Sequence, residues 1–322
     1  MMTRSDFKHK QVIFVFLNEG EKVAFSNDNI IVKDKGGKIR FQSTCYRLFS
    51  VFLIGSLSFT DQLIKKSHQF GFSIVLMTSS FRVHDMIGFR MEGNVLLRRT
   101  QYQYTGNDLA RHIIFNKLTN QRYALNLRRQ KPAEVKDAIE KIDGYRNAIK
   151  TYDGDLEGLL GLEGSAARIY FKNHFHQIDW QGRKPRIKID YVNSTLDIGY
   201  TLVFNLIDAM LRLYGFDTYQ GVMHKQFYMR KSLSCDLMEP FRPLIDLQVK
   251  KAIHLSQCKA DDFTVKNGRY ELKWEKNKEY TGFLMKPLME DKEEIFLYVQ
   301  SYYRCFMKQK EVDEYPIYKI GE

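Results

Sequence analysis

The first third of the chain is a series of short apolar runs separated by polar or glycine-bearing turns, a pattern typical of β-strands. It predicts strands over residues 12–17, 22–25, 30–33, 38–42, 50–57 and 72–77. The clearest turns are residues 18–20 and 35–37. Residues 60–70 predict one short helix that Gly71 would end. The sequence therefore indicates a small β-rich domain with one inserted helix.

After residue 104 the apolar positions recur at the spacing of amphipathic helices. Helices are predicted over about residues 107–129, 132–150, 156–171, 195–214 and 290–308. Asn107 and Ser194 are the expected N-caps of two of them, and Gly215 is the expected end of one. Asn267 and Gly268 predict the turn of a β-hairpin, and the polar residues 309–322 predict a loosely held tail.

The composition shifts at residues 97–104, which are polar and basic and separate the strand pattern from the helical one. We place a domain boundary there, with a β-rich domain over residues 1–104 and a helical domain over residues 105–322. The expected fold class is α+β. With 322 residues and 44% hydrophobic content, the chain can form real cores.

The chain is basic, with 50 lysines and arginines against 38 acidic residues and a formal net charge of +12. This balance favours an anionic partner such as nucleic acid, although solubility alone could explain a modest excess. The first ten residues lack the apolar run of a signal peptide, and no later apolar stretch is long enough to cross a bilayer. A cytoplasmic protein without a membrane partner is expected.

Cysteine and histidine usage argues against a structural zinc site. The four cysteines are far apart and form no Cys-x-x-Cys pair, so neither a zinc ribbon nor a disulfide framework is indicated. They are expected to be buried thiols in a reducing compartment. His174 and His176 would point to different faces of a helix, so both are expected at the surface.

Glu163 is the first candidate for chemistry, because it falls within an apolar helical stripe formed by residues 156–170. Burying an unpaired carboxylate is strongly unfavourable, so Glu163 is expected to meet a cation, a metal ion or a hydrogen-bonding cluster. An ion pair with Arg168 is the plain structural alternative. Gly161 and Gly164 remove bulk on either side, which would let a neighbouring backbone or a DNA strand approach.

The second candidate is the stretch that follows His224. Asp236 and Glu239 are three residues apart, so on a helix starting near Ser232 or Ser234 they project from the same face. A proton, a basic side chain or a divalent cation would relieve their repulsion. Two carboxylates with one imidazole suit manganese or magnesium better than structural zinc. A solvated helix start is the alternative.

Basic residues lie near both acidic segments and could contact DNA phosphates. They are Arg183 and Arg186 in the loop over residues 182–188, and Lys225, Arg230, Lys231 and Arg242 around the second acidic segment. The loop could equally be a solvated connector. The other four could equally neutralise Asp236 and Glu239.

Three motifs in fixed order resemble one known family, the CRISPR-associated integrase and endonuclease that is the catalytic subunit of the CRISPR adaptation (spacer acquisition) complex. The motifs are LLGLEGSAA over residues 159–167, DYVN over 190–193 with GY at 199–200, and His224 followed by SLSCDLMEPFRP over 232–243. They cover the helical two-thirds of the chain in detail. Pro240 is less usual for this pattern and would disturb the local helix.

The resemblance implies a β-sandwich-like N-terminal domain, a larger all-α catalytic domain, and a homodimer formed largely through the N-terminal domains. It also implies a small companion adaptation protein of the same CRISPR locus. Glu163, His224 and Glu239 would be the ligands of Mg²⁺ or Mn²⁺, with Asp236 beside them in the catalytic set. The residues expected to support the site or the DNA are Arg168, Asn193 and Tyr200.

The implied activity is a metal-dependent DNA integrase that joins the 3′-hydroxyl ends of short duplex DNA, called prespacers, to a repeat array by transesterification. One alternative is a metal-dependent nuclease on branched or flapped DNA, which would use the same ligands with water as the attacker. Another is a non-catalytic DNA-binding scaffold in which the acids only form ion pairs. A transposition integrase of a mobile element would keep the chemistry in another setting.

Overall fold

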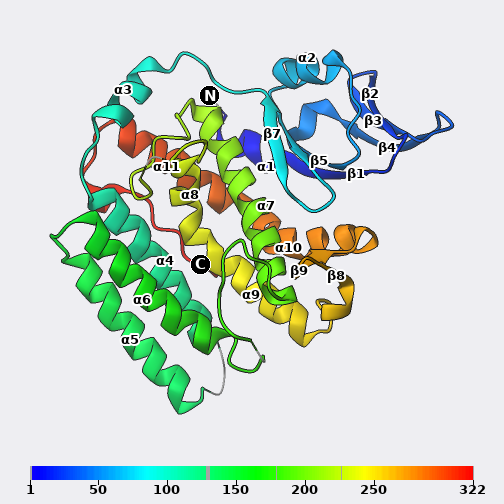
Figure 1. Cartoon of the computed structure of the whole chain (residues 1–322). Helices are drawn as coiled ribbons and strands as arrows, with labels where there is room; N and C mark the ends of the chain where they lie inside the picture. Colours follow the sequence, from blue (N-terminus) through cyan, green and yellow to red (C-terminus); the bar gives the residue numbers. More distant parts are fainter. Residues whose placement is uncertain (1, 128–130, 179, 226, 322) are drawn as a thin grey trace.

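The computed structural model describes residues 2–127, 131–178, 180–225 and 227–321. Its N-terminal part is strand-rich and the remainder mainly helical, as the α+β fold class predicts (Figure 1). The strands of the N-terminal part are β1 (Gln11–Leu17), β2 (Lys22–Ser26), β3 (Asn29–Lys33), β4 (Ile39–Thr44), β5 (Leu48–Gly55), β6 (Ser73–Met77) and β7 (Val83–Gly88). The six predicted strands are confirmed, and β7 is an additional one.

The strands form two sheets. One has the order β1-β5-β6-β7, with β1, β5 and β6 parallel and β7 antiparallel, and the other is the antiparallel β2-β3-β4. The two faces of β5 are both buried: Val51 and Leu53 join a core with the second sheet, whereas Phe52 and Ile54 join a core with the helices. This two-sided burial explains why β5 reads as a continuous apolar run.

The inserted helix of the N-terminal part is also confirmed. Helix α2 (Asp61–Phe70) ends at Gly71, whose φ of 72° lies in the left-handed region that glycine adopts without a steric penalty. The arrangement of two sheets around one core agrees with the expected β-sandwich-like domain.

The helices confirm the longer periodic segments. They are α1 (Arg4–Lys8), α3 (Val95–Gln103), α4 (Asp108–Asn126), α5 (Ala133–Lys150), α6 (Leu156–His174), α7 (Tyr191–Tyr214), α8 (Ser232–Met238), α9 (Arg242–His254), α10 (Asn277–Glu290) and α11 (Lys292–Met307). The sequence patterns did not predict α1, α3 or α10. Helices α4, α5 and α6 lie side by side, and α7 runs through the middle of the molecule (Figure 1). The predicted end of the first long helix, near residue 129, lies outside the described residues.

The start of α7 differs from the expectation. Asp190 is the N-cap, because its carboxylate accepts a hydrogen bond from the backbone N–H of Asn193 at 2.6 Å. Ser194 lies inside the helix, and its hydroxyl donates to the carbonyl of Tyr270. The predicted cap at Ser194 is therefore wrong by one turn, whereas the predicted end at Gly215 is confirmed.

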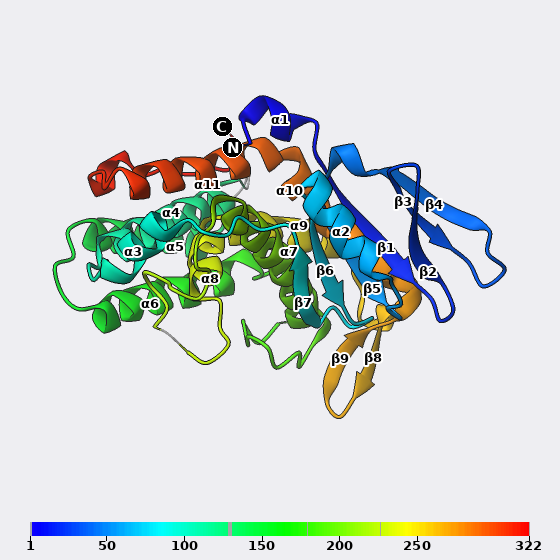
Figure 2. The ribbon, with the colours of Figure 1, turned by 90° about the horizontal axis from the view of Figure 1, so that it is seen from above.

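The predicted hairpin is confirmed as β8 (Phe263–Lys266) and β9 (Arg269–Leu272), and it projects from the body of the molecule (Figure 2). Asn267 and Gly268 both have positive φ, as a tight two-residue turn requires. The backbone N–H of Tyr270 donates to the carbonyl of Lys188, so the base of the hairpin is fastened to the basic loop before α7.

The strand-rich and helical parts share one hydrophobic core. Phe52 and Ile54 from β5 and Met86 from β7 belong to the same cluster as residues of α7 and α11. Phe7 of α1 stacks on Phe296 of α11, with ring centroids 4.3 Å apart. Packing is thus continuous between the two parts. The boundary between residues 104 and 105 and the dimerisation role of residues 1–104 stay predictions.

Two surface expectations are wrong. His174 is fully buried and its ring stacks on that of Tyr170 at 5.0 Å, whereas His176 is exposed as expected. The C-terminal tail is also anchored, because Tyr315, Tyr318 and Ile320 are buried. These apolar side chains of the tail pack on the hydrophobic core beside α4 and α11 and shield it from water.

In the described ranges, no helix combines the length and the apolar character needed to span a bilayer.

Candidate active site

The two candidate glutamates meet at a lysine. Lys117 of α4 places its Nζ 2.5 Å from Oε1 of Glu163 on α6 and 2.7 Å from Oε2 of Glu239, which follows α8. Lys117 and Glu239 are buried, whereas the side chain of Glu163 is 20% exposed. Two carboxylates that are 76 residues apart by number (239 minus 163) therefore share one ammonium group. The alternative pair of Glu163 with the exposed Arg168 is not formed.

Lys117 was missed in the sequence analysis, although a signal for it exists. It falls four residues after Ile113 and three after Ile114, so it lies on the apolar stripe of α4. A lysine on such a stripe needs an anionic partner, for the same reason that Glu163 needs a cation. Lys117 and Glu163 are both charged residues on apolar helical stripes, and this shared feature suggests that they form a pair.

Polar side chains of α4 also hold the segment that carries Glu239. The Nδ2 of Asn120 donates to the carbonyls of Pro240 and Tyr318, at 2.9 and 3.0 Å. Asn116 donates to the same Tyr318 carbonyl, so the C-terminal tail is tied to α4 directly behind Lys117. The tail and α4 thereby fix the backbone next to Glu239.

Pro240 interrupts the helix as expected. Helix α8 ends at Met238, residues Glu239–Phe241 form one turn of 3-10 helix, and α9 begins at Arg242. The turn keeps Glu239 and Arg242 on the same side, and Nη1 of Arg242 lies 3.2 Å from Oε1 of Glu239. Burial raises the pKa of Glu239, but the charges of Arg242 and Lys117 outweigh this and lower the pKa to about 2. Glu239 is therefore ionised at neutral pH.

His224 is held from behind by Asp236. The Nδ1 of His224 lies 2.6 Å from Oδ1 of the fully buried Asp236, which also accepts hydrogen bonds from the backbone N–H groups of Val222, Met223 and His224. A carboxylate accepts, so Nδ1 carries the proton and Nε2 keeps its lone pair. Asp236 is thus a positioning residue for the imidazole rather than a neighbour of Glu239 in one acid pair.

Gly221 permits the close approach of this loop. A Cβ at residue 221 would lie 2.6 Å from Oδ2 of Asp236 and 2.7 Å from Cβ of Ser232. Only glycine leaves room for the backbone of the loop to surround the Asp236 carboxylate.

Behind Arg242 lies a buried layer centred on Asp246, which the sequence analysis also missed. The hydroxyls of Tyr170 and Tyr200 both donate to its carboxylate, the first at 3.0 Å. The guanidinium of Arg242 lies over the Tyr200 ring, 4.7 Å from its centroid. Burial raises the pKa of Asp246 to about 6 despite these two donors. Tyr200 therefore contacts the site through Arg242.

The remaining residues expected to support the site or the DNA fall into two groups. Those with exposed side chains are Arg168, Arg186 and Lys225. Those engaged inside the protein are Arg183 with Asn193 and Asp197, Lys231 with Asp208, and Arg230 with the Lys225 carbonyl and the Ser232 hydroxyl. Arg183 and Asn193 thus close the loop before α7, and Arg230 and Lys231 fix the loop before α8.

The fit of this site to a divalent ion is mixed. Among the described residues, no three acidic, histidine or cysteine side chains surround one point closely enough to hold a metal as they stand. Three features favour an ion nevertheless. Glu239 is buried and ionised, and its Oε2 lies 2.7 Å from the ammonium group of Lys117. Glu163 and Glu239 already share one cation. His224 is near Glu239, since a positive charge on its ring would lower the pKa of Glu239. Two carboxylates and one imidazole fit Mg²⁺ or Mn²⁺.

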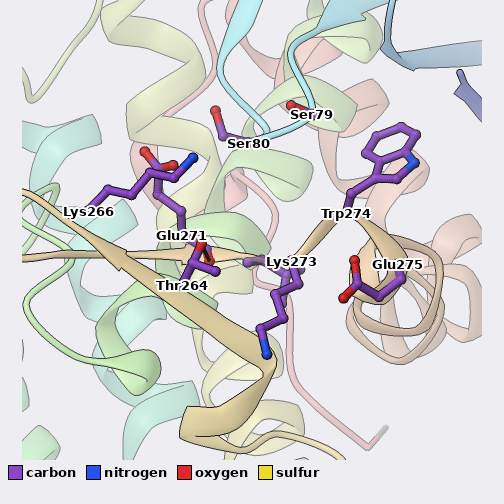
Figure 3. A pocket seen from close by; sticks show the side chains of 9 residues that line it. Ser79, Ser80, Thr264, Lys266, Glu271, Lys273, Trp274 and Glu275 are labelled. Carbon is purple, nitrogen blue, oxygen red and sulfur yellow. Dashed lines mark hydrogen bonds between the residues drawn. The ribbon is translucent and has the colours of Figure 1, made fainter. Parts of the chain in front are cut away.

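A separate cavity of about 370 Å³ lies between the hairpin and the turn after β6 (Figure 3). Its lining includes Ser79, Ser80, Thr264, Lys266 and Trp274, and none of the candidate ligands. Its lining holds both lysines and glutamates, so no single ligand chemistry is indicated. The acidic site is therefore the stronger candidate.

The chain has clear relatives among known proteins. The family model of the CRISPR associated protein Cas1 matches residues 14–284. A protein named CRISPR-associated endonuclease Cas1 1, from Chlorobaculum tepidum, is 29% identical over 283 residues, which cover 80% of each chain. Two solved structures share the fold. One, titled Cas6-RT-Cas1--Cas2 complex, has a TM-score of 0.82 at 21% identity and covers 98% of this chain and 36% of that chain.

The second, titled casposase bound to integration product, has a TM-score of 0.75 at 18% identity and covers 97% of this chain and 95% of that chain. At these identities the two structures establish the fold alone. The match of the family model spans most of both the strand-rich and the helical part, including Lys117, Glu163, His224 and Glu239. The chain therefore belongs to the Cas1 family of CRISPR-associated proteins.

Proposed function

We propose that this protein is a divalent-metal-dependent DNA integrase of CRISPR adaptation, which joins the 3′-hydroxyl ends of short duplex DNA to a repeat array. The observation that carries the proposal is the meeting of Glu163 and Glu239 at one cation position, beside a histidine held by Asp236. Family membership supports it, and so does the likeness in fold to a casposase described as bound to an integration product.

In this proposal Glu163, His224 Nε2 and Glu239 hold Mg²⁺ or Mn²⁺. Once bound, such an ion would stabilise the charge that develops on the attacked phosphodiester and on the leaving oxygen. One phosphodiester is exchanged for another, so no external energy source is required. The protein then contributes mainly position and charge.

The side chains of the protein divide this work. Asp236 fixes the orientation and the tautomer of His224, and Arg242 keeps Glu239 ionised. Arg242 is one-third exposed, so its guanidinium can also reach a phosphate oxygen. Lys225 and Arg186 have exposed side chains, and they would bind the DNA backbone away from the reacting phosphate.

We further propose that the working assembly contains two copies of this chain and a small companion protein of the same locus. One similar structure is described as a complex of Cas6-RT-Cas1 with Cas2, which supports the companion. Residues 1–104 would form the dimer contact and residues 105–322 the catalytic domain. The assembly would act in the cytoplasm, on prespacer DNA and the repeat array.

The test is strand joining on a supercoiled plasmid that carries a repeat, with short duplexes that have free 3′-hydroxyl ends and with Mn²⁺ or Mg²⁺. We expect covalent joining by the wild type and a loss of at least 100-fold in the Glu163→Gln and Glu239→Gln variants. Glu157→Gln, an exposed glutamate on the same helix as Glu163, is the matched control and should join DNA normally.

Two other results would redirect the assignment. Hydrolysis of flapped DNA without any joining would favour the nuclease, a reading that the endonuclease names of the relatives also support. Equal product formation by wild type and both glutamine variants would mean that the acids form ion pairs only, which is the scaffold alternative.

A further inference from the structure

The ammonium group of Lys117 lies where an ion shared by Glu163 and Glu239 would have to lie. Its Nζ is 2.5 Å from one carboxylate and 2.7 Å from the other. A divalent ion bound to both would approach each oxygen to about 2.1 Å, which needs the same space between them. The ammonium and the ion therefore exclude one another.

Charge leads to the same conclusion. Glu163 and Glu239 carry two negative charges, and Lys117 and Arg242 carry two positive charges against them. The group is neutral as it stands. A divalent ion added beside a buried ammonium would leave a large positive excess in a region of low dielectric, which is unfavourable. Exchange of Lys117 for the ion removes part of that excess.

The surroundings permit such an exchange. Glu163 is the exposed side of the cluster, whereas Lys117 and Glu239 lie deeper. The Glu163 side chain keeps 20% of its surface accessible, so solvent and a small ion can reach its carboxylate directly. An ion entering from this side meets Glu163 first, and the long side chain of Lys117 can turn away from it.

We infer that Lys117 is the counter-ion of Glu163 and Glu239 in the metal-free protein. When a divalent ion binds to the two carboxylates, the ammonium group of Lys117 moves away from them. This inference rests on the proposed function, because it takes Glu163 and Glu239 as the ligands. Metal binding is then an exchange of one cation, the Lys117 ammonium group, for another, the divalent ion. The affinity for the ion is then lower than the two carboxylates alone would give, and Lys117 stabilises the metal-free protein.

The test compares Mn²⁺ binding and thermal unfolding of the full chain, both without DNA. Lys117→Met removes the charge and shortens the unbranched side chain by only one atom. Lys117→Gln serves if the methionine variant folds poorly. We expect both variants to bind Mn²⁺ at least tenfold more tightly than the wild type. They should also melt at a lower temperature in a chelator and regain more of that loss on addition of Mn²⁺ than the wild type does.

Lys276→Met is the matched control. Lys276 also bridges two carboxylates, those of Asp262 and Glu279, at 3.1 and 3.0 Å, and neither is a candidate ligand. Its replacement should leave the affinity for Mn²⁺ unchanged. If the wild type binds Mn²⁺ and both Lys117 variants bind it equally or more weakly, the counter-ion role of Lys117 is overturned and the metal site stands. No binding by any of the proteins would overturn both.

Discussion

The Nδ1 of His224 lies 2.6 Å from Oδ1 of Asp236, and the same carboxylate accepts three backbone N–H groups of the loop that carries the histidine. One buried acid thus fixes both the ring and the main chain before α8. The loop that carries His224 therefore has little freedom to place the imidazole elsewhere.

Replacement of Asp236 by asparagine should weaken both the loop and the site. Asparagine offers one acceptor where four donors converge, so at least one buried N–H would lose its partner, at a cost of about 1–3 kcal/mol or more. We expect strand joining to fall about 10- to 100-fold, as for other groups that orient a metal ligand. Activity is measured below the unfolding temperature, with the exposed Asp261→Asn as control. Activity and stability equal to wild type would remove this role.

Replacement of Gly161 or Gly164 by alanine should raise the stability of the protein and lower its affinity for DNA. An added Cβ meets no protein atom within 4 Å at either position, so each helical substitution should stabilise the fold by about 0.4–1 kcal/mol. If DNA passes over this surface, as we expect, its affinity for the variants should fall severalfold. Gly144→Ala on the neighbouring α5 is equally unhindered and should gain stability only. Wild-type DNA affinity in both site variants would show that no strand lies there.

Removal of residues 315–322 should destabilise the protein strongly. Tyr315, Tyr318 and Ile320 are buried, and losing the burial of three such side chains costs at least about 4 kcal/mol. The loss of the Tyr318 carbonyl also leaves Asn116 without its partner. Thermal unfolding monitored by circular dichroism measures the effect. Removal of residues 321–322 alone is the control, with an expected change within about 0.5 kcal/mol. An unchanged melting temperature after the longer deletion would contradict the anchored tail.

Asp246 should make stability depend on pH in the sense opposite to most carboxylates. Its pKa is raised from an ordinary 3.8 to about 6, so the folded state holds the proton more tightly than the unfolded state. The resulting stabilisation is complete below pH 3.8 and is lost as the pH rises through 6. At about 1.4 kcal/mol per pKa unit, the change is about 3 kcal/mol.

Urea denaturation of wild type and Asp246→Asn between pH 4 and 7 isolates this contribution, because asparagine does not titrate. The free energy of unfolding of the wild type minus that of the variant should decrease as the pH rises. A difference that stays constant over this range, or that increases, would mean that burial does not raise the pKa of Asp246.

Much of the fold follows from local pattern. The strands, the hairpin turn at Asn267 and Gly268, and the helix ends at Gly71 and Gly215 depend on alternation, periodicity and glycine conformation, which neighbouring residues determine. Helix α10 was missed although Tyr280, Leu284 and Leu288 recur at helical spacing, because Gly282 and Pro287 within it disfavour a helix. The tail was missed because its buried side chains, Tyr315, Tyr318 and Ile320, lie in a segment without helix or strand, so their burial follows no sequence period.

The site was predictable to a different extent. Motif order brought Glu163, His224, Asp236 and Glu239 into one hypothesis, and the structure places Glu163 and Glu239 at one shared cation. The sequence could not show that Asp236 holds His224 whereas Glu239 faces Lys117. This difference depends on how the loop with His224, 12 residues before Asp236, folds back onto α8. Asp246 acts across helices, and its partners are set by tertiary packing alone. Lys117 also acts across helices, but its place on the apolar stripe of α4 does signal the need for an anionic partner.

The most direct test of the central claim is a crystal structure of the full chain with Mn²⁺, in which anomalous scattering locates the ion. The account predicts one peak in contact with a carboxylate oxygen of Glu163 and one of Glu239, with Lys117 Nζ no longer between them. A Mn²⁺ peak elsewhere, with Lys117 still bridging the two glutamates at saturating Mn²⁺, would contradict it.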